Sequence, residues 1–297
     1  MSLKNLILNS FPRYCENLIS GKSVCFRPMV VLEEKSLLMV KDSQNKESVI
    51  KTLVNIVSSC FDDFNMEEYS ISDLEHAFLL LRAKSLGEYE EFTITCPVTK
   101  ERVNFSINIL KDVILNKTSV DSTIKLNEKL ILVMNKPTIN HILKYPEYNV
   151  NSESIYPFIA SCIHQIHSEK TIISCKEKPE QEIIEFVQNL SPKQFKSIIN
   201  YFDSLPFVEF LPEYKTSDGQ TRSVSIRGIF TFIDFFFNHL TLEFFYRQNF
   251  QMNYFHNYSL TEINNMIPWE RSVYVAQIHS HISDETNRAN NTSELRF

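Results

Sequence analysis

The stretch SDLEHAFLLLRAKSLGEYEEFTITCPVTKERVNFSINI, residues 72–109, decides the fold class, because its hydrophobic period changes partway along. The first half places apolar residues at helical spacing. It predicts a helix that Ser72 caps, with Glu75 completing the capping box, and that Gly87 ends. In the second half, apolar and polar residues alternate on both sides of residues 97–102, which predicts a β-hairpin. A helix followed directly by a hairpin indicates an α+β protein.

Further helices are predicted on both sides of this stretch. Upstream, an extended segment from Phe26 leads into a helix that ends near Val40, and residues 48–61 carry a core-facing apolar stripe at helical spacing. Downstream, residues 124–134 alternate again and predict another hairpin, after which a short helix begins at Pro137. The first half of the chain therefore combines helices with hairpins.

The second half of the chain repeats this combination. Helices are predicted over residues 155–174, 179–188 and 191–202, the last with a Ser-Pro start that places Pro at the favoured first position. Residues 205–229 predict a hairpin that turns at Ser217-Asp218-Gly219. This half therefore also places a hairpin after helices.

An aromatic-rich helical segment is predicted from residue 230 to residue 283, interrupted at Pro268 and followed by a polar, frayed tail over residues 284–297. The predicted units are an N-terminal segment (1–21), helices plus β-hairpins (22–136), helices plus a second hairpin (137–229), and a helical C-terminal module with a frayed tail (230–297). We predict an α+β fold in which helices pack with β-hairpins and a mainly helical, aromatic-rich C-terminal module follows.

Composition excludes several classes of protein. Hydrophobic residues make up 43% of the chain and charged residues 22%, the balance of a soluble globular protein. The 4 glycines are isolated, so a Gly-rich phosphate-binding loop has no place. A net charge of −6 argues against a nucleic-acid partner. No secretory signal is expected, and no apolar stretch approaches the ~20 residues of a membrane span.

The six cysteines are scattered along the chain, which favours reduced thiols in a cytoplasmic protein. The best candidate metal ligands are Cys162, His164, His167 and Cys175. On the predicted helix, His164 and His167 share a face while Cys162 points elsewhere. We therefore expect core thiols, partly exposed histidines and no bound metal or other cofactor.

The sequence carries no motif that indicates catalysis. A nucleophilic serine on a Gly-x-Ser-x-Gly elbow is absent, and a Cys/His pair would have to be assembled by the fold. We therefore predict that the protein is not an enzyme. A Cys/His-dependent hydrolase that uses Cys162 or Cys175 remains an alternative.

Several segments between residues 22 and 285 carry a family resemblance. They are Phe26-Arg27-Pro28, Glu33-Glu34-Lys35, the run from Leu81 to Glu88, residues 190–206, Arg227-Gly228 before Phe235-Phe236, and residues 246–271, with Met266-Ile267-Pro268-Trp269-Glu270-Arg271 the most distinctive. Together they resemble the T4-type phage baseplate hub assembly family of contractile tails. Some members of that family carry a paired-cysteine metal ribbon in the hairpin. Cys96 has Thr99 where a second thiolate would be needed, so no zinc site is implied here.

The resemblance implies a protein that acts by protein–protein interaction, in a chaperone-like way, during assembly of the baseplate hub late in infection. The implied partners are the baseplate hub and tape-measure proteins of the same phage, and the implied location is the host cytoplasm during assembly. An alternative is a permanent structural component of the virion baseplate, which would use the same surfaces.

The aromatic residues between Phe230 and Phe255 are too numerous to form one amphipathic stripe. Part of them would be exposed as a partner site, although an internal aromatic core is the alternative. We interpret residues 246–271 as a docking module attached to the α+β body, with its tryptophan as a hinge pin between helices in preference to a partner anchor. The predicted partner-binding residues are Phe236, Tyr246, Phe250, Tyr254, Trp269 and Arg271.

Overall fold

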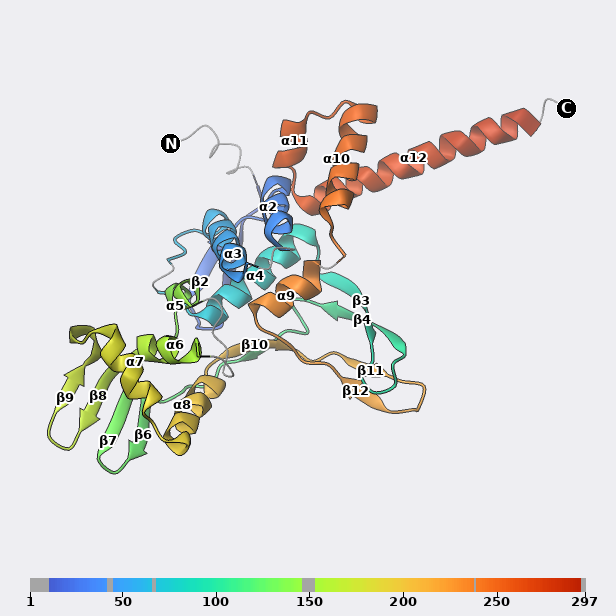
Figure 1. Ribbon diagram of the computed structural model, residues 1–297. Helices are drawn as coiled ribbons and strands as arrows, with labels where there is room; N and C mark the ends of the chain where they lie inside the picture. The colour runs from blue at the N-terminus through green and yellow to red at the C-terminus, as the bar shows by residue number, and fades with distance from the viewer. Residues whose placement is uncertain (1–10, 42–44, 66–67, 146–152, 238, 295–297) are drawn as a thin grey trace.

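The computed structural model describes residues 11–41, 45–65, 68–145, 153–237 and 239–294, with only the backbone described from residue 285 onward. Within them, helices pack with small antiparallel sheets (Figure 1). The predicted α+β fold is therefore confirmed. None of the described helices is both long enough and apolar enough to cross a membrane.

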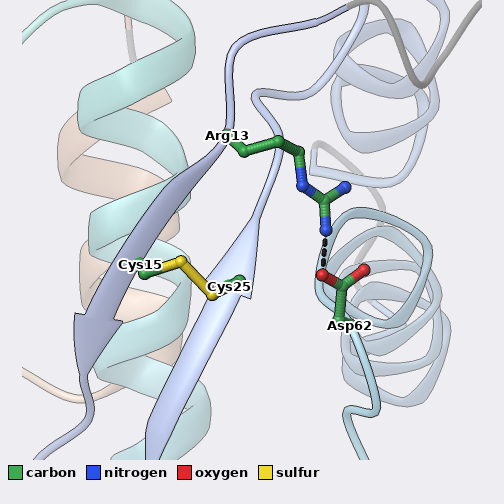
Figure 2. Close-up of a disulfide and its surroundings, with 4 residues drawn as sticks. All are labelled: Arg13, Cys15, Cys25 and Asp62. Atoms are coloured by element: carbon green, nitrogen blue, oxygen red, sulfur yellow. Dashed lines mark hydrogen bonds and ion pairs between the residues drawn. A yellow bond between two sulfur atoms is a disulfide. The ribbon is translucent and has the colours of Figure 1, made fainter.

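The chain begins with a hairpin of β1 (Tyr14–Asn17) and β2 (Ser23–Phe26). Cys15 and Cys25 are directly opposite each other in its register, and a disulfide joins them (Figure 2). The prediction of reduced thiols is therefore wrong for these two cysteines, because strand pairing brings distant sequence positions together. Figure 2 also shows an ion pair between Arg13 and Asp62, which connects the hairpin to the residues that follow α3 (Lys46–Cys60).

Three helices follow, α2 (Val31–Lys41), α3 (Lys46–Cys60) and α4 (Ile71–Leu86), and pack against one another. The predicted cap of α4 is wrong by two residues. Ser70 is the N-cap and Asp73 completes the capping box, while Ser72 donates a hydrogen bond to the carbonyl of Pro206. Gly87 ends α4 as predicted, at a φ of 127° that favours glycine.

Two hairpins extend from one side of the body (Figure 1). The first pairs β3 (Tyr89–Thr95) with β4 (Arg102–Asn108), and the second pairs β11 (Glu213–Lys215) with β12 (Thr221–Ser223), as both sequence patterns predict. A three-stranded sheet lies between them and the helices. Its strands, in the order β13-β10-β5, are β13 (Ile226–Arg227), β10 (Phe207–Phe210) and β5 (Ile114–Asn116).

A second group of elements contains a four-stranded sheet of β6 (Thr123–Asn127), β7 (Leu130–Met134), β8 (Ile163–Ser168) and β9 (Ile172–Ser174). Its helices are α6 (Ile155–Cys162), η1 (Cys175–Glu177), α7 (Glu180–Gln188) and α8 (Pro192–Ser204), and α5 (Ile139–Lys144) leads into it. The helix predicted over residues 155–174 is therefore wrong beyond Cys162. There β8 pairs with β7 and β9, and this tertiary pairing overrides the helical pattern.

The C-terminal quarter is helical, with α9 (Ile229–Phe237), α10 (Leu242–His256), α11 (Leu260–Asn265) and α12 (Pro268–Glu294). The predicted interruption at Pro268 is the start of α12. The tail predicted to fray from residue 284 is helical as far as Glu294. At 27 residues, α12 is about 40 Å long, and its C-terminal part projects away from the body (Figure 1).

Two large hydrophobic cores, and a small third one formed by Cys96, Val103 and Tyr214, hold the described residues together. The first core joins the N-terminal hairpin, α2, α3, α4 and α9, and it includes Phe245 of α10, Met252 of α10 and Ile263 of α11. The second core fills the space between the four-stranded sheet and helices α6, α7 and α8. The C-terminal helices are therefore continuous with the body through one of their faces.

Candidate partner-binding surface

Helix α10 has one buried face and one exposed face. Its buried residues are Phe245, Gln248, Asn249 and Met252. On the opposite face, Tyr246, Phe250 and Tyr254 are spaced four residues apart, so they lie above one another along the helix. Their exposed fractions are 51%, 57% and 68%, and that of the neighbouring Phe255 is 62%. We call Tyr246, Phe250, Tyr254 and Phe255 the α10 aromatic stripe.

Three rings of the α10 aromatic stripe, those of Phe250, Tyr254 and Phe255, contact one another. The Phe250 and Tyr254 rings stack with centroids 5.3 Å apart, and the Phe255 ring meets the Tyr254 ring edge-on at 5.0 Å. At the other end, the Lys35 ammonium lies 5.2 Å from the centroid of the Tyr246 ring. Aromatic side chains such as these contribute much of the binding free energy when a protein partner buries them.

A buried ion pair fixes the position of α10 and α12 on the body. The Arg271 guanidinium lies 3.0 Å from a Glu34 carboxylate oxygen, and the two side chains are only 4% and 1% exposed. Arg271 also donates to the Asn249 side chain of α10, and its guanidinium carbon lies 4.8 Å from the Phe245 ring centroid. Burial raises the pKa of Glu34 and lowers the pKa of Arg271, which indicates how strongly both charges are desolvated.

The six predicted partner-binding residues divide into two groups. Tyr246, Phe250 and Tyr254 are together on the α10 aromatic stripe, and Trp269, in the first turn of α12, is 44% exposed. Trp269 is therefore not fully buried between helices, as the predicted hinge role would require. The prediction is corrected for Phe236, which is fully buried, and for Arg271, which is 3% exposed, because neither can reach a partner in this conformation.

Phe255 belongs to the aromatic run but is not among the six predicted residues. Helix α10 begins after Thr241, whose side chain accepts a hydrogen bond from the Phe244 N–H. The spacing of four between Tyr246, Phe250 and Tyr254 places these three residues on one face of α10, but this spacing does not reveal which face is exposed.

The candidate metal ligands do not converge. Cys162 ends α6, whereas His164 and His167 lie three positions apart on β8 and so point to opposite faces of the sheet. Burial raises the pKa of Cys162 to about 12 and also raises that of Cys175, which keeps both thiols protonated. The described part of the chain contains no group of three or more His, Cys, Asp or Glu side chains that could hold a metal ion.

Cys96 lies where the tips of the β3–β4 and β11–β12 hairpins meet. Its sulfur accepts a hydrogen bond from the Tyr214 hydroxyl at 3.6 Å. Hydrogen bonds from the Thr99 side chain and backbone, and then from Tyr214, lower the pKa of the Cys96 thiol to about 7. The Thr99 and Tyr214 hydroxyls thus contact this sulfur, and Thr99 stands where a zinc site would need a second thiolate.

Comparison with known families gives one match. A family model described as T4 bacteriophage base plate protein matches residues 12–234, about three quarters of the chain. No curated protein and no solved structure gives a significant match. The matched residues end within α9, so the α10 aromatic stripe lies beyond them.

Proposed function

The chain belongs to the T4 bacteriophage base plate protein family, and from this premise we propose that it assists assembly of the baseplate hub through protein–protein contacts. In this proposal it acts in a chaperone-like way on hub or tape-measure proteins, in the cytoplasm of the infected host cell. The observation that supports the proposal is the α10 aromatic stripe. It presents four partly exposed aromatic residues along a helix that the body holds in place.

The proposed contact follows from the energetics of the α10 aromatic stripe. Each ring exposes more than half of its surface, and burying such rings against a partner is favourable at roughly 25 cal/mol per Å² of apolar area. Phe245 and Met252 on the opposite face belong to the first core, so the helix is already ordered before a partner arrives. Such preorganisation lowers the entropy cost of association. We therefore propose the stripe as the main contact with a hub or tape-measure protein.

A non-enzymatic role is part of this proposal. The thiols on which the hydrolase alternative depends, Cys162 and Cys175, are both buried and have raised pKa values. A protonated, enclosed thiol is a poor nucleophile. This observation supports an interaction protein over a Cys/His-dependent hydrolase.

Replacing Phe250 and Tyr254 together by alanine is expected to weaken partner binding at least tenfold, because interface hot spots cost about 2 kcal/mol or more each on truncation. The melting temperature should change little, since both rings are largely exposed. The measurement is co-purification, followed by calorimetric titration, with each hub and tape-measure protein of the phage.

The matched control replaces Tyr89 and Ile172 by alanine, because these residues are 69% and 67% exposed on other elements. The control should bind as the wild type does. Equal loss in both double variants would remove the α10 aromatic stripe from the proposal. If none of the hub and tape-measure proteins binds the folded wild-type chain, the assembly role itself fails.

A permanent place in the virion baseplate is the second candidate function, and the match to a family of base plate proteins favours it. Quantitative mass spectrometry of purified particles distinguishes the two roles. An assembly factor should be absent or far below the copy number of the hub proteins. A stoichiometric amount in the particle would establish the structural role instead.

A further inference from the structure

A cavity of about 460 Å³ lies where the two hydrophobic cores face each other. On one side are the first turns of α4 and the turn between β1 and β2, and on the other side are α6 and α8. Most of its wall is apolar, with Ile71 of α4 facing the second-core residues Phe158 and Phe202. Its volume is within the range of small-ligand sites, roughly 300–1,000 Å³.

The carboxyl group of Glu75 lines this apolar cavity, although the residue is only 7% exposed. It accepts a hydrogen bond from the Ile229 N–H. A carboxylate offers about four acceptor positions, so this contact leaves acceptor capacity unused. Burial raises the pKa of Glu75 to about 8, against the opposing effect of Arg227, so the group lacks a full counter-charge.

The other carboxylate of this helix turn is already committed. Asp73 accepts from the Ser20 N–H at 3.1 Å, and from the N–H and hydroxyl of Ser70 at 3.1 and 2.8 Å. These bonds complete the α4 capping box and hold the β1–β2 turn. Of the two carboxylates on this helix turn, Glu75 is therefore the one that can take up a new partner.

Two of the three cations that line the cavity have other contacts. Lys22 donates to the Glu68 carbonyl at 2.9 Å and pairs with its carboxylate, and the Arg227 guanidinium carbon lies 3.8 Å from the Phe207 ring centroid. The charged groups that line the cavity besides Glu75 are Lys22, Glu68, Asp73, Lys136, Asp203 and Arg227. Within the described residues, no direct ion pair joins Glu75 to any of these cations.

We propose that the cavity binds an apolar group that ends in an ammonium ion, with the ammonium on the Glu75 carboxylate and the apolar part between α4 and α8. The walls supply affinity through apolar burial, and the buried Glu75 carboxylate supplies selectivity for a cation. Such a group occurs in small aromatic or alkyl amines and in a lysine side chain flanked by apolar residues. The proposal does not depend on the α10 aromatic stripe.

Binding of a cation requires the charged form of Glu75, so affinity must depend on pH. With the pKa of Glu75 near 8 in the free protein, the carboxyl is mostly protonated at pH 6 and gives up its proton on binding. Affinity for an amine should therefore rise as pH increases from 6 to 8, by up to tenfold per unit, and should level off above pH 8. A neutral ligand of the same shape should show no such rise.

The test titrates the full chain at pH 6, 7 and 8 with tryptamine and with tryptophol, its neutral hydroxyl counterpart, by calorimetry. Tryptamine should bind at least tenfold more tightly than tryptophol at pH 8, and this preference should shrink towards pH 6. Glu75→Gln should abolish both the preference and its pH dependence, whereas Asp203→Asn, at another carboxylate of the cavity, should preserve them.

Two further measurements keep the outcome decisive. The wild-type pH series tests the proposal alone if Glu75→Gln does not fold. A short acetylated peptide with one lysine between two leucines, compared with its Nε-acetyl-lysine form, distinguishes a protein segment from a free amine as the source of the ammonium. Equal binding of tryptamine and tryptophol at every pH, binding of neither, or a preference that survives in Glu75→Gln would overturn the proposal.

Discussion

Replacement of Phe236 by alanine is expected to destabilise the protein by about 3–5 kcal/mol, the usual cost of truncating a buried phenylalanine. The Phe236 side chain is fully buried in the first core. Its ring lies 5.4 Å from that of Phe210 and 5.7 Å from that of Phe92, and the Arg82 guanidinium carbon lies 5.7 Å from its centroid. Alanine would leave a cavity among three elements that meet at this ring.

Urea unfolding of Phe236→Ala, Phe236→Leu and Phe250→Ala measures this effect against matched controls. Phe236→Leu keeps most of the buried volume and should cost clearly less than alanine. Phe250 is 57% exposed, so Phe250→Ala should stay within about 0.5 kcal/mol of the wild type. Equal effects at positions 236 and 250 would mean that α9 is not part of the core.

The same reasoning applies to a chain that ends at Gly228. This truncation removes α9, and with it Phe232, Ile233, Phe236 and Phe237, from the first core. We expect the truncated chain to aggregate or remain unfolded. The interpretation of residues 246–271 as a module merely attached to the body is accordingly revised, because Phe245, Met252 and Ile263 on the inner faces of α10 and α11 share the same core.

Elements whose signals are local could be predicted from the sequence. The Ser-Pro start of α8, the positive-φ glycine after α4 and the alternation of β3 and β4 depend on neighbouring residues, and all three are present in the fold. The helix predicted over residues 155–174 is wrong beyond Cys162 because β8 is stabilised by pairing with β7, about thirty residues earlier in the chain. The disulfide between Cys15 and Cys25 likewise depends on strand register, which cysteine spacing does not reveal.

The candidate site could be predicted only in part, because tertiary contacts decide which side of a helix is buried. Helices α9 and α10 illustrate this. Helix α9 reads IFTFIDFFF and is apolar almost all round, the pattern of a buried helix, whereas α10 mixes aromatic with polar residues. Phe236 of α9 could therefore have been assigned to the core. Which side of α10 faces the body depends on its contacts with α2 and α11, so the exposure of Tyr246, Phe250 and Tyr254 required the structure.

The cavity beside Glu75 could not be predicted from the sequence. Its walls come from α4, α6 and α8, which are distant in the chain and belong to different cores. The sequence pattern assigned Glu75 to a capping box, a role that Asp73 fulfils instead. Glu75 instead lies in the wall of the mostly apolar cavity.

Replacement of Arg271 by alanine is the second change with a large expected effect, about 3–5 kcal/mol of lost stability. The reason is that Glu34, whose side chain is 1% exposed, would keep its burial and lose its counter-charge. Arg247→Ala is the matched control, since the Arg247–Glu243 pair is exposed and should contribute no more than about 1 kcal/mol. Chemical denaturation of both variants gives the comparison.

The double variant Glu34→Leu with Arg271→Met tests whether the protein needs the charges of this buried pair or only the packing of its two side chains. Well-packed apolar residues often replace a buried ion pair without loss of stability, so the double variant should be far more stable than Arg271→Ala alone. Because Arg271 connects α12 to α2 and contacts Asn249 of α10, Arg271→Ala should also displace the α10 aromatic stripe and weaken partner binding. The double variant should restore binding together with stability if the pair acts only by holding the helices in place. Restored stability without restored binding would instead show that the charges orient the stripe, since apolar packing cannot reproduce the directional bond from Arg271 to Asn249.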